Sequence, residues 1–114
     1  METSLSEVLR DVLAFRDARD WKQFHTPKNL AVSVSLEAAE LLEIFQWLGD
    51  AESISEEKRA RAADEMADVL IYLLLLGDAL KVDLLSSVRA KIRKNELSYP
   101  VSKAKGSAKK YDEL

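Results

Sequence analysis

Two pairs of acidic residues constrain the fold of this chain more than any other feature of its sequence. Glu37 pairs with Glu40 and Glu65 pairs with Asp68, each spaced i and i+3 inside a strongly apolar stretch. On an α-helix, residues three apart lie one turn from each other on the same side. The pattern therefore predicts two helices, each of which presents two carboxylates from one patch of its surface.

The apolar neighbours of these acids place the carboxylates where a hydrophobic core is expected. Glu37 shares a helical stripe with Leu41, Ile44 and Leu48, and Asp68 is followed at helical spacing by Tyr72 and Leu75. A buried carboxylate costs on the order of several kcal/mol unless a cation or hydrogen-bond donors compensate it. Acids are usually solvated on helix surfaces, but two such pairs in apolar sequence favour a site for a hard cation, Mg²⁺ or in its place Mn²⁺.

A di-iron carboxylate bundle is a related alternative, because it also carries acids inside four helices. That site uses two Glu-x-x-His motifs. The chain has a single histidine, His25, which lies outside the long apolar helices. We therefore set the di-iron hypothesis aside.

The composition predicts an all-α domain. A chain of 114 residues corresponds to about one domain, and 47% hydrophobic residues with only 3 glycines and 2 prolines favour helices over strands. We expect a four-helix bundle over residues 1–97. From Ser98 onwards the chain is rich in Ser, Lys, Ala and Gly, which is typical of a flexible or partner-docked tail over residues 98–114.

Capping signals locate the four helices. Ser4 and Glu7 have capping-box spacing, Thr26 precedes Pro27, Ser53 and Glu56 repeat the capping-box spacing, and Asp83 can cap the last helix. The expected helices run from Ser4 to about Arg19, from Pro27 to about Trp47 ahead of Gly49, from about Ser55 to Leu80, and from Leu84 towards Ser98. The second and third are apolar around much of their circumference, which predicts a homo-oligomer that packs on these helices.

Several classes of protein do not fit this sequence. The net charge of −3 argues against a general binder of nucleic acid polymers, which would carry a basic face. The absence of cysteine excludes disulfides, thiolate metal sites and cysteine nucleophiles. The first residues lack the pattern of a signal peptide, and the apolar run from Val69 to Leu76 is far shorter than the roughly 20 residues that span a bilayer. We expect a cytoplasmic, soluble protein that does not enter a membrane.

Aromatic residues bracket the second helix. Trp21, Phe24, His25 and Trp47 have packing as their simplest role. Near a metal site they gain another, because a nucleobase can stack on an aromatic ring while the metal holds its phosphates. Lys91 and Asn95 lie on the apolar stripe of the fourth helix, where they could contact a phosphate or a base. A lysine whose stem covers apolar surface is the alternative for Lys91.

With these residues assembled, the chain resembles the MazG-like all-α nucleoside triphosphate pyrophosphohydrolases, and within them the dCTP-specific branch. The family signature occurs as Glu37-Ala-Ala-Glu40 and Glu65-Met-Ala-Asp68. The more specific segments are Asp20-Trp-Lys-Gln-Phe-His25, Glu43-Ile-Phe-Gln-Trp47, Asp68-Val-Leu-Ile-Tyr72 and Lys110-Tyr-Asp-Glu-Leu114. One departure is Leu36, where the broader motif often has another acid.

The resemblance implies a role for each of these residues. Glu37, Glu40, Glu65 and Asp68 would hold Mg²⁺ and through it a triphosphate. The base and sugar pocket would be formed by Trp21, His25, Trp47 and Tyr72. Lys91 and Asn95 would contact the nucleotide from the last helix. The family fold is a helical bundle that assembles as a dimer or a dimer of dimers, with sites formed between subunits.

We therefore expect a Mg²⁺-dependent enzyme that hydrolyses dCTP, or a 5-modified dCTP, to the monophosphate and pyrophosphate, and so removes unwanted nucleotides from the pool. One alternative keeps the chemistry and relaxes the base preference to dATP, dUTP or several nucleotides. An alternative of another class is a non-catalytic helical adaptor whose acids are structural.

Overall fold

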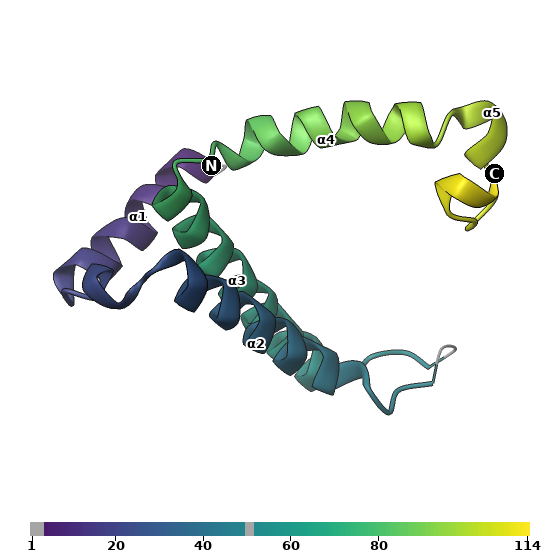
Figure 1. Cartoon of the computed structure of the whole chain (residues 1–114). Helices are drawn as coiled ribbons and strands as arrows, with labels where there is room; N and C mark the ends of the chain where they lie inside the picture. Colours follow the sequence, from purple (N-terminus) through teal and green to yellow (C-terminus); the bar gives the residue numbers. More distant parts are fainter. Residues whose placement is uncertain (1–3, 50–51) are drawn as a thin grey trace. The chain divides into compact units, whose positions relative to one another are not determined.

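The computed structural model describes residues 4–49 and 52–114, and within these residues the chain forms helices and no strand. The all-α prediction is confirmed. The elements in chain order are α1 (Leu5–Ala18), η1 (Lys22–Phe24), α2 (Pro27–Phe45), α3 (Glu56–Leu80), α4 (Leu84–Ser98), α5 (Val101–Ala104) and η2 (Tyr111–Glu113), where η denotes a 3₁₀ helix (Figure 1).

Side-chain caps fix where the four long helices begin. Ser4, Thr26, Ser55 and Asp83 each accept a hydrogen bond, 3.2 Å long, from the backbone N–H three residues later. Such a cap stabilises a helix by about 1 kcal/mol, because it satisfies an amide that has no partner inside the helix. Three of these caps match the sequence prediction. For α3 the cap is Ser55 and not Ser53, so the helix begins with Glu56 and Glu57 in its first turn.

The C-terminus of α2 lies earlier than predicted. The helix ends at Phe45, and the backbone then tightens into a turn in which the Leu48 N–H donates to the Phe45 carbonyl over 3.0 Å. Terminal turns often tighten in this way, because i to i+3 hydrogen bonds use carbonyls that the helix leaves free. As a result Trp47 lies beyond the helix, with 87% of its surface exposed.

Two helix contacts build the core of the first part of the chain. The helices α2 and α3 run side by side, and α1 packs against α3 (Figure 1). The most buried apolar side chains come from α2 and α3, namely Leu30, Ile44, Ala62, Leu74 and Leu75. Leu30 is only 1% exposed. The interface between α2 and α3 is therefore the hydrophobic centre of this part of the chain.

The chain divides into two compact units at Lys81 and Val82. The second unit comprises α4, α5 and η2, and within it the rings of Tyr99 and Tyr111 meet edge to face with centroids 6.1 Å apart. The predicted tail thus contains two short helical segments, while its boundary at residue 98 stays a prediction. So does the four-helix bundle, since the helix contacts described above join α1, α2 and α3.

None of the helices in residues 4–49 and 52–114 combines the length and the apolar character that crossing a bilayer requires.

Candidate metal centre

Three of the four predicted acids come together between α2 and α3. Glu37 on α2 and Glu65 and Asp68 on α3 each offer one carboxylate oxygen, and these three oxygens lie within 4.8 Å of one another. The spacing of i and i+3 puts Glu65 and Asp68 on the same side of α3, and the pairing of α3 with α2 brings Glu37 opposite them. We call Glu37, Glu65 and Asp68 the carboxylate cluster.

The carboxylate cluster interrupts an apolar interface. Leu30 and Ile44 lie seven residues before and after Glu37, which is about two helical turns on the same face. These two side chains are 1% and 5% exposed, whereas Glu37 is half-buried between them. Any apolar residue at position 37 would continue the buried stripe, so the fold alone does not account for a carboxylate there.

The carboxylate cluster has unsatisfied hydrogen-bonding capacity. Glu37 Oε2 and Glu65 Oε2 are both buried, and neither has a hydrogen-bond partner. A buried polar atom without a partner costs about 1–3 kcal/mol, and more when it is charged. Carboxylate oxygens are the ligands that Mg²⁺ and Mn²⁺ prefer. A divalent cation would satisfy both atoms, so the donor set fits such an ion.

Burial and mutual repulsion change the acidity of the cluster. Burial first, and then the neighbouring carboxyls of Glu40, Glu65 and Asp68, raise the pKa of Glu37 from 4.5 to about 7. The pKa of Glu65 is also raised, by burial and by the charges of Glu40 and Asp68. Both shifts have the same physical cause, because a partly desolvated acid beside other acids resists ionisation. A bound cation would reverse this effect.

This pKa shift predicts how the stability of the metal-free protein depends on pH. Below pH 4.5 Glu37 is protonated in both the folded and the unfolded chain, so its ionisation does not change the free energy of unfolding. Between pH 4.5 and about 7 the unfolded chain releases this proton while the folded chain retains it. The free energy of unfolding should therefore fall as pH rises through this window. Urea denaturation in EDTA at several pH values measures this free energy of unfolding.

The control for this prediction is Glu37→Gln, which removes the titrating group. In this variant the free energy of unfolding should fall less as the pH rises. Glu43→Gln, on the same helix but exposed, should leave the decrease unchanged. Addition of Mg²⁺ at pH 7.5 should restore stability to the wild-type chain, because the cation binds the ionised carboxylates. A pH profile that is identical in wild type and Glu37→Gln would contradict the assignment.

Glu40, the fourth predicted ligand, lies at the edge of the carboxylate cluster. Glu40 is exposed, and its carboxyl is close enough to Glu37 and Glu65 to raise the pKa of both. The oxygens that lie within 4.8 Å of one another come from Glu37, Glu65 and Asp68. Coordination by Glu40 stays a prediction.

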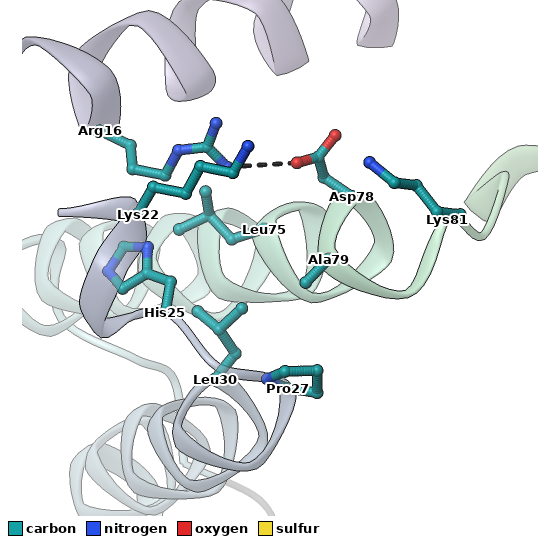
Figure 2. A pocket seen from close by; sticks show the side chains of 9 residues that line it. All are labelled: Arg16, Lys22, His25, Pro27, Leu30, Leu75, Asp78, Ala79 and Lys81. Atoms are coloured by element: carbon teal, nitrogen blue, oxygen red, sulfur yellow. Dashed lines mark hydrogen bonds and ion pairs between the residues drawn. The ribbon is translucent and has the colours of Figure 1, made fainter. Parts of the chain in front are cut away.

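His25, predicted as a substrate contact, lines a cavity of about 230 Å³ near one end of α2 and α3. Its Nδ1 atom is buried and lacks a hydrogen-bond partner. The pKa of His25 is lowered, first by burial and then by the nearby charge of Arg16, so the imidazole is neutral at pH 7. The other residues of this cavity, which we call the His25 cavity, are Arg16, Lys22, Pro27, Leu30, Leu75, Asp78, Ala79 and Lys81 (Figure 2).

Sequence reasoning missed one part of this region, the buried Arg16. Its side chain is held from two directions, because Nη1 donates to Asp78 Oδ2 over 3.2 Å and Nε donates to Asp17 Oδ1 over 2.8 Å. The Arg16 to Asp78 ion pair joins α1 to α3 across 62 positions of sequence. The available signal was that Arg16 follows Val12 by four residues, on the apolar face of the first helix.

The predicted aromatic residues do not gather around one point. Trp21 packs edge to face on Phe15, with ring centroids 5.8 Å apart, and the guanidinium of Arg19 lies 3.6 Å from the centre of the Phe15 ring. Tyr72 is half-buried on α3, one helical turn beyond Asp68. Trp47 stays exposed beyond the end of α2. Among these, Tyr72 is the one whose position in the sequence places it directly beside the carboxylate cluster.

Lys91 and Asn95 belong to the second unit. Both lie on α4 and are exposed, and they are four residues apart on the same side of the helix. Val88 and Ile92, predicted at core-facing positions of the apolar stripe on α4, are 55% and 52% exposed, so the stripe is not buried in the single chain. The contact of Lys91 and Asn95 with a nucleotide stays a prediction.

Comparison with known proteins places the chain among nucleotide-processing enzymes. The MazG-like family model matches residues 32–114. The chain is 41% identical to dCTP pyrophosphatase 1 of Rattus norvegicus and 40% identical to that of Homo sapiens, in each case over 99% of this chain and 69% of the relative. A crystal structure of a pyrophosphatase from Archaeoglobus fulgidus is similar with a TM-score of 0.81 at 45% identity, covering 88% of this chain and 95% of that one.

Proposed function

The chain belongs to the MazG-like family, and from this premise we propose that it hydrolyses dCTP, or a 5-modified dCTP, to the monophosphate and pyrophosphate with Mg²⁺ as cofactor. The observation that carries the proposal is the carboxylate cluster with its two unpartnered oxygens. Such a cluster at the centre of an apolar interface suits a cation that in turn binds a triphosphate. The relatives named for dCTP hydrolysis support the choice of nucleotide.

The residues of the cluster would act together on the triphosphate. Glu37, Glu65 and Asp68 would hold the cation, with Glu40 joining them from the edge. Mg²⁺ bound there would neutralise charge on the phosphate groups and orient them. A carboxylate oxygen that does not face the cation can accept a proton from the attacking water, as a general base does. The apolar flanks at Leu30 and Ile44 lower the local dielectric and thereby strengthen these interactions.

The nucleoside part of the substrate would be held by the other predicted residues. Tyr72 lies one turn from Asp68 and can reach the sugar of a nucleotide whose phosphates are bound at the cluster. We assign Trp21, His25 and Trp47 to the same pocket, which forms only when copies of this chain pack together, and we assign Lys91 and Asn95 to contacts from α4. The His25 cavity lies about 10 Å from the cluster, since Leu30 is seven residues from Glu37 on α2. That distance is within the length of a nucleoside triphosphate.

A panel of nucleotides tests the proposed substrate. Purified protein with Mg²⁺ should release pyrophosphate from dCTP and 5-methyl-dCTP, and release it at least about tenfold more slowly from dATP and dUTP, because a pocket that hydrogen-bonds one base rejects bases that leave its polar groups unpaired. Chromatography should identify dCMP as the second product. Equal rates for purines and pyrimidines would replace the dCTP assignment by relaxed specificity.

A homo-oligomer is part of the proposal. Both α2 and α3 carry large apolar side chains that are strongly exposed in the single chain, including Leu36 at 60%, Leu42 at 64% and Met66 at 57%. Exposed apolar surface of this kind is typical of an interface. We infer that copies of this chain pack on these helices as a dimer or a dimer of dimers. Light scattering that gives a monomeric mass at micromolar concentration would contradict this inference.

A further inference from the structure

A groove with a volume of about 420 Å³ lies between α1 and α3, and we call it the apolar groove. Its walls include Val8, Val12 and Phe15 from α1 and Leu70, Ile71 and Leu74 from α3. Phe15 and Leu70 are 53% and 44% exposed, although they belong to two helices that pack against each other. The groove is therefore apolar surface that α1 and α3 leave open.

The lining of the apolar groove suits an apolar partner better than a nucleotide. A pocket for a small polar ligand carries a few polar groups that fix the orientation of the ligand. Among the described residues that line the groove, Asp11 is the one with a polar side chain. Contiguous exposed apolar surface is typical of a contact with another protein surface. The groove therefore fits a row of apolar side chains from a partner helix.

The helix α4 carries an exposed apolar stripe of matching length. Leu85, Val88 and Ile92 are three and four residues apart on one side of the helix, and each of them is more than half exposed. The stripe rises by seven residues, or about 10 Å, and the α1 wall from Val8 to Phe15 spans the same number of residues. The stripe and the apolar groove thus agree in length and in chemistry.

Charge also favours a contact between these two surfaces. Residues 1–81 contain 16 acidic and 9 basic side chains, whereas residues 82–114 contain 4 acidic and 8 basic ones. At the groove, Asp11 is part of the lining and Glu7 precedes it by one helical turn on α1. On α4, Arg89 follows Val88 and lies at the edge of the stripe. Surfaces of opposite charge attract each other and fix the register of a contact.

The short connection between α3 and α4 favours a second copy of the chain as the source of the stripe. The helix α3 ends at Leu80 and α4 begins at Leu84. In a helical hairpin with so short a connection, residues at equal distances from its middle lie opposite each other. Val88 would then face Leu76, which is about 8 Å along α3 from the groove walls at Leu70 and Ile71. The stripe of another copy has no such restriction.

We propose that the apolar groove is a docking site for the α4 stripe of a second copy of this chain. Because groove and stripe belong to the same chain, two copies can exchange their α4 helices and form two identical contacts that close by two-fold symmetry. Lys91 and Asn95 lie to one side of the stripe, so docking leaves them available for the nucleotide contacts proposed above. The inference rests on the proposed homo-oligomer and does not depend on hydrolysis.

Cross-linking between two singly substituted variants tests the docking, because the chain contains no cysteine. Val12→Cys places a thiol in the groove, and Val88→Cys places one on the stripe. The two variants are unfolded together in urea, refolded and treated with a short bismaleimide. Since each chain carries one thiol, every cross-link joins two copies. We expect the mixture to yield at least about tenfold more covalent dimer than either variant alone, because docking raises the local concentration of one thiol near the other.

The matched control is Lys94→Cys, whose side chain lies on the opposite side of α4 from Val88. Mixed with Val12→Cys, it should yield about tenfold less covalent dimer than Val88→Cys does. Equal yields from positions 88 and 94 would overturn the docking, since random collision would give that result. A chain with both Val12→Cys and Val88→Cys that links only within itself would also overturn it, because its own α4 would then occupy the groove.

Light scattering of the same samples separates this inference from the homo-oligomer on which it rests. An oligomeric mass without the cross-link between positions 12 and 88 would overturn the docking of α4 alone. A monomeric mass would overturn the docking and the homo-oligomer together. Neither result bears on the carboxylate cluster, which lies between α2 and α3.

A second pair of variants tests the contact without cysteine. Val88→Asp places a charge on the stripe, and docking would bury this charge at a large cost in desolvation. Leu97→Asp makes an equivalent change on the opposite side of α4, where Leu97 is 86% exposed. Val88→Asp should raise the protein concentration at which the assembly dissociates by at least about tenfold, and Leu97→Asp should not. An equal shift in both variants, or a shift in neither, would overturn the proposal.

Discussion

Asp68→Asn is expected to lower Mg²⁺-dependent release of pyrophosphate from dCTP by at least about 100-fold while leaving the helical content unchanged. Asn has the shape of Asp and lacks its charge, so the substitution removes an anionic ligand from the cluster and little else. Loss of one preorganised charge partner in an active site reduces the rate by about 10²–10³-fold. The carboxylate of Asp68 lies within 4.8 Å of those of Glu37 and Glu65, which makes it central to the cluster.

The matched control for this prediction is Glu43→Gln. It makes the same chemical change at an exposed position on α2 outside the cluster, and it should retain full activity. Far-ultraviolet circular dichroism checks that both variants keep their helices. Because Asp68 repels Glu37 and Glu65, the metal-free Asp68→Asn variant should be at least as stable as the wild type. Unaltered hydrolysis in Asp68→Asn would contradict the metal-site assignment, whereas the absence of hydrolysis in both the wild type and the variant would favour the adaptor hypothesis.

Leu30→Ala is expected to destabilise the fold by about 2–5 kcal/mol, a large share of the stability of a small domain. Leu30 is 1% exposed at the interface of α2 with α3, so truncation leaves a cavity that neighbouring helices cannot fill without moving. Leu30 also lines the His25 cavity, which should widen. The free energy of unfolding from urea denaturation measures the first effect.

Leu42→Ala on the same helix is the control, since its side chain is 64% exposed in the single chain. If α2 contributes to contacts between copies, Leu42→Ala should shift the dependence of stability on protein concentration. Leu30→Ala should lower stability at every concentration. If the two variants lost the same free energy of unfolding at every protein concentration, this would contradict the distinction between the core of the chain and its oligomer interface.

Local sequence patterns were sufficient to predict the presence of the four long helices and three of the acids that lie close together between α2 and α3. Thr26 ahead of Pro27 and Asp83 ahead of Leu84 are caps that act over three residues, so their effect is readable without tertiary structure. The carboxylate cluster was predictable for a related reason. The spacing of Glu65 and Asp68 fixes them on one face of α3, and the apolar residues around Glu37 place it at the interface with that face.

The His25 cavity was not predictable, because it depends on contacts between residues far apart in sequence. The Arg16 to Asp78 ion pair spans 62 positions, and nothing local to either residue indicates the other. The end of α2 was predicted two residues too late for a different reason. Helical periodicity continues through Trp47, whereas the backbone turns after Phe45. Periodicity reports which face of a helix is apolar and is less informative about where the helix ends.

The measurement that tests the central claim most directly is pyrophosphate release from dCTP by the purified full chain, first with Mg²⁺ and then with excess EDTA. If the carboxylate cluster holds the cation that binds the triphosphate, release should require Mg²⁺, stop on addition of EDTA and return when Mg²⁺ is restored in excess. Release that continues undiminished in EDTA, or no release from any nucleoside triphosphate with Mg²⁺ present, would contradict the assignment of Glu37, Glu65 and Asp68 as the metal centre of a pyrophosphohydrolase.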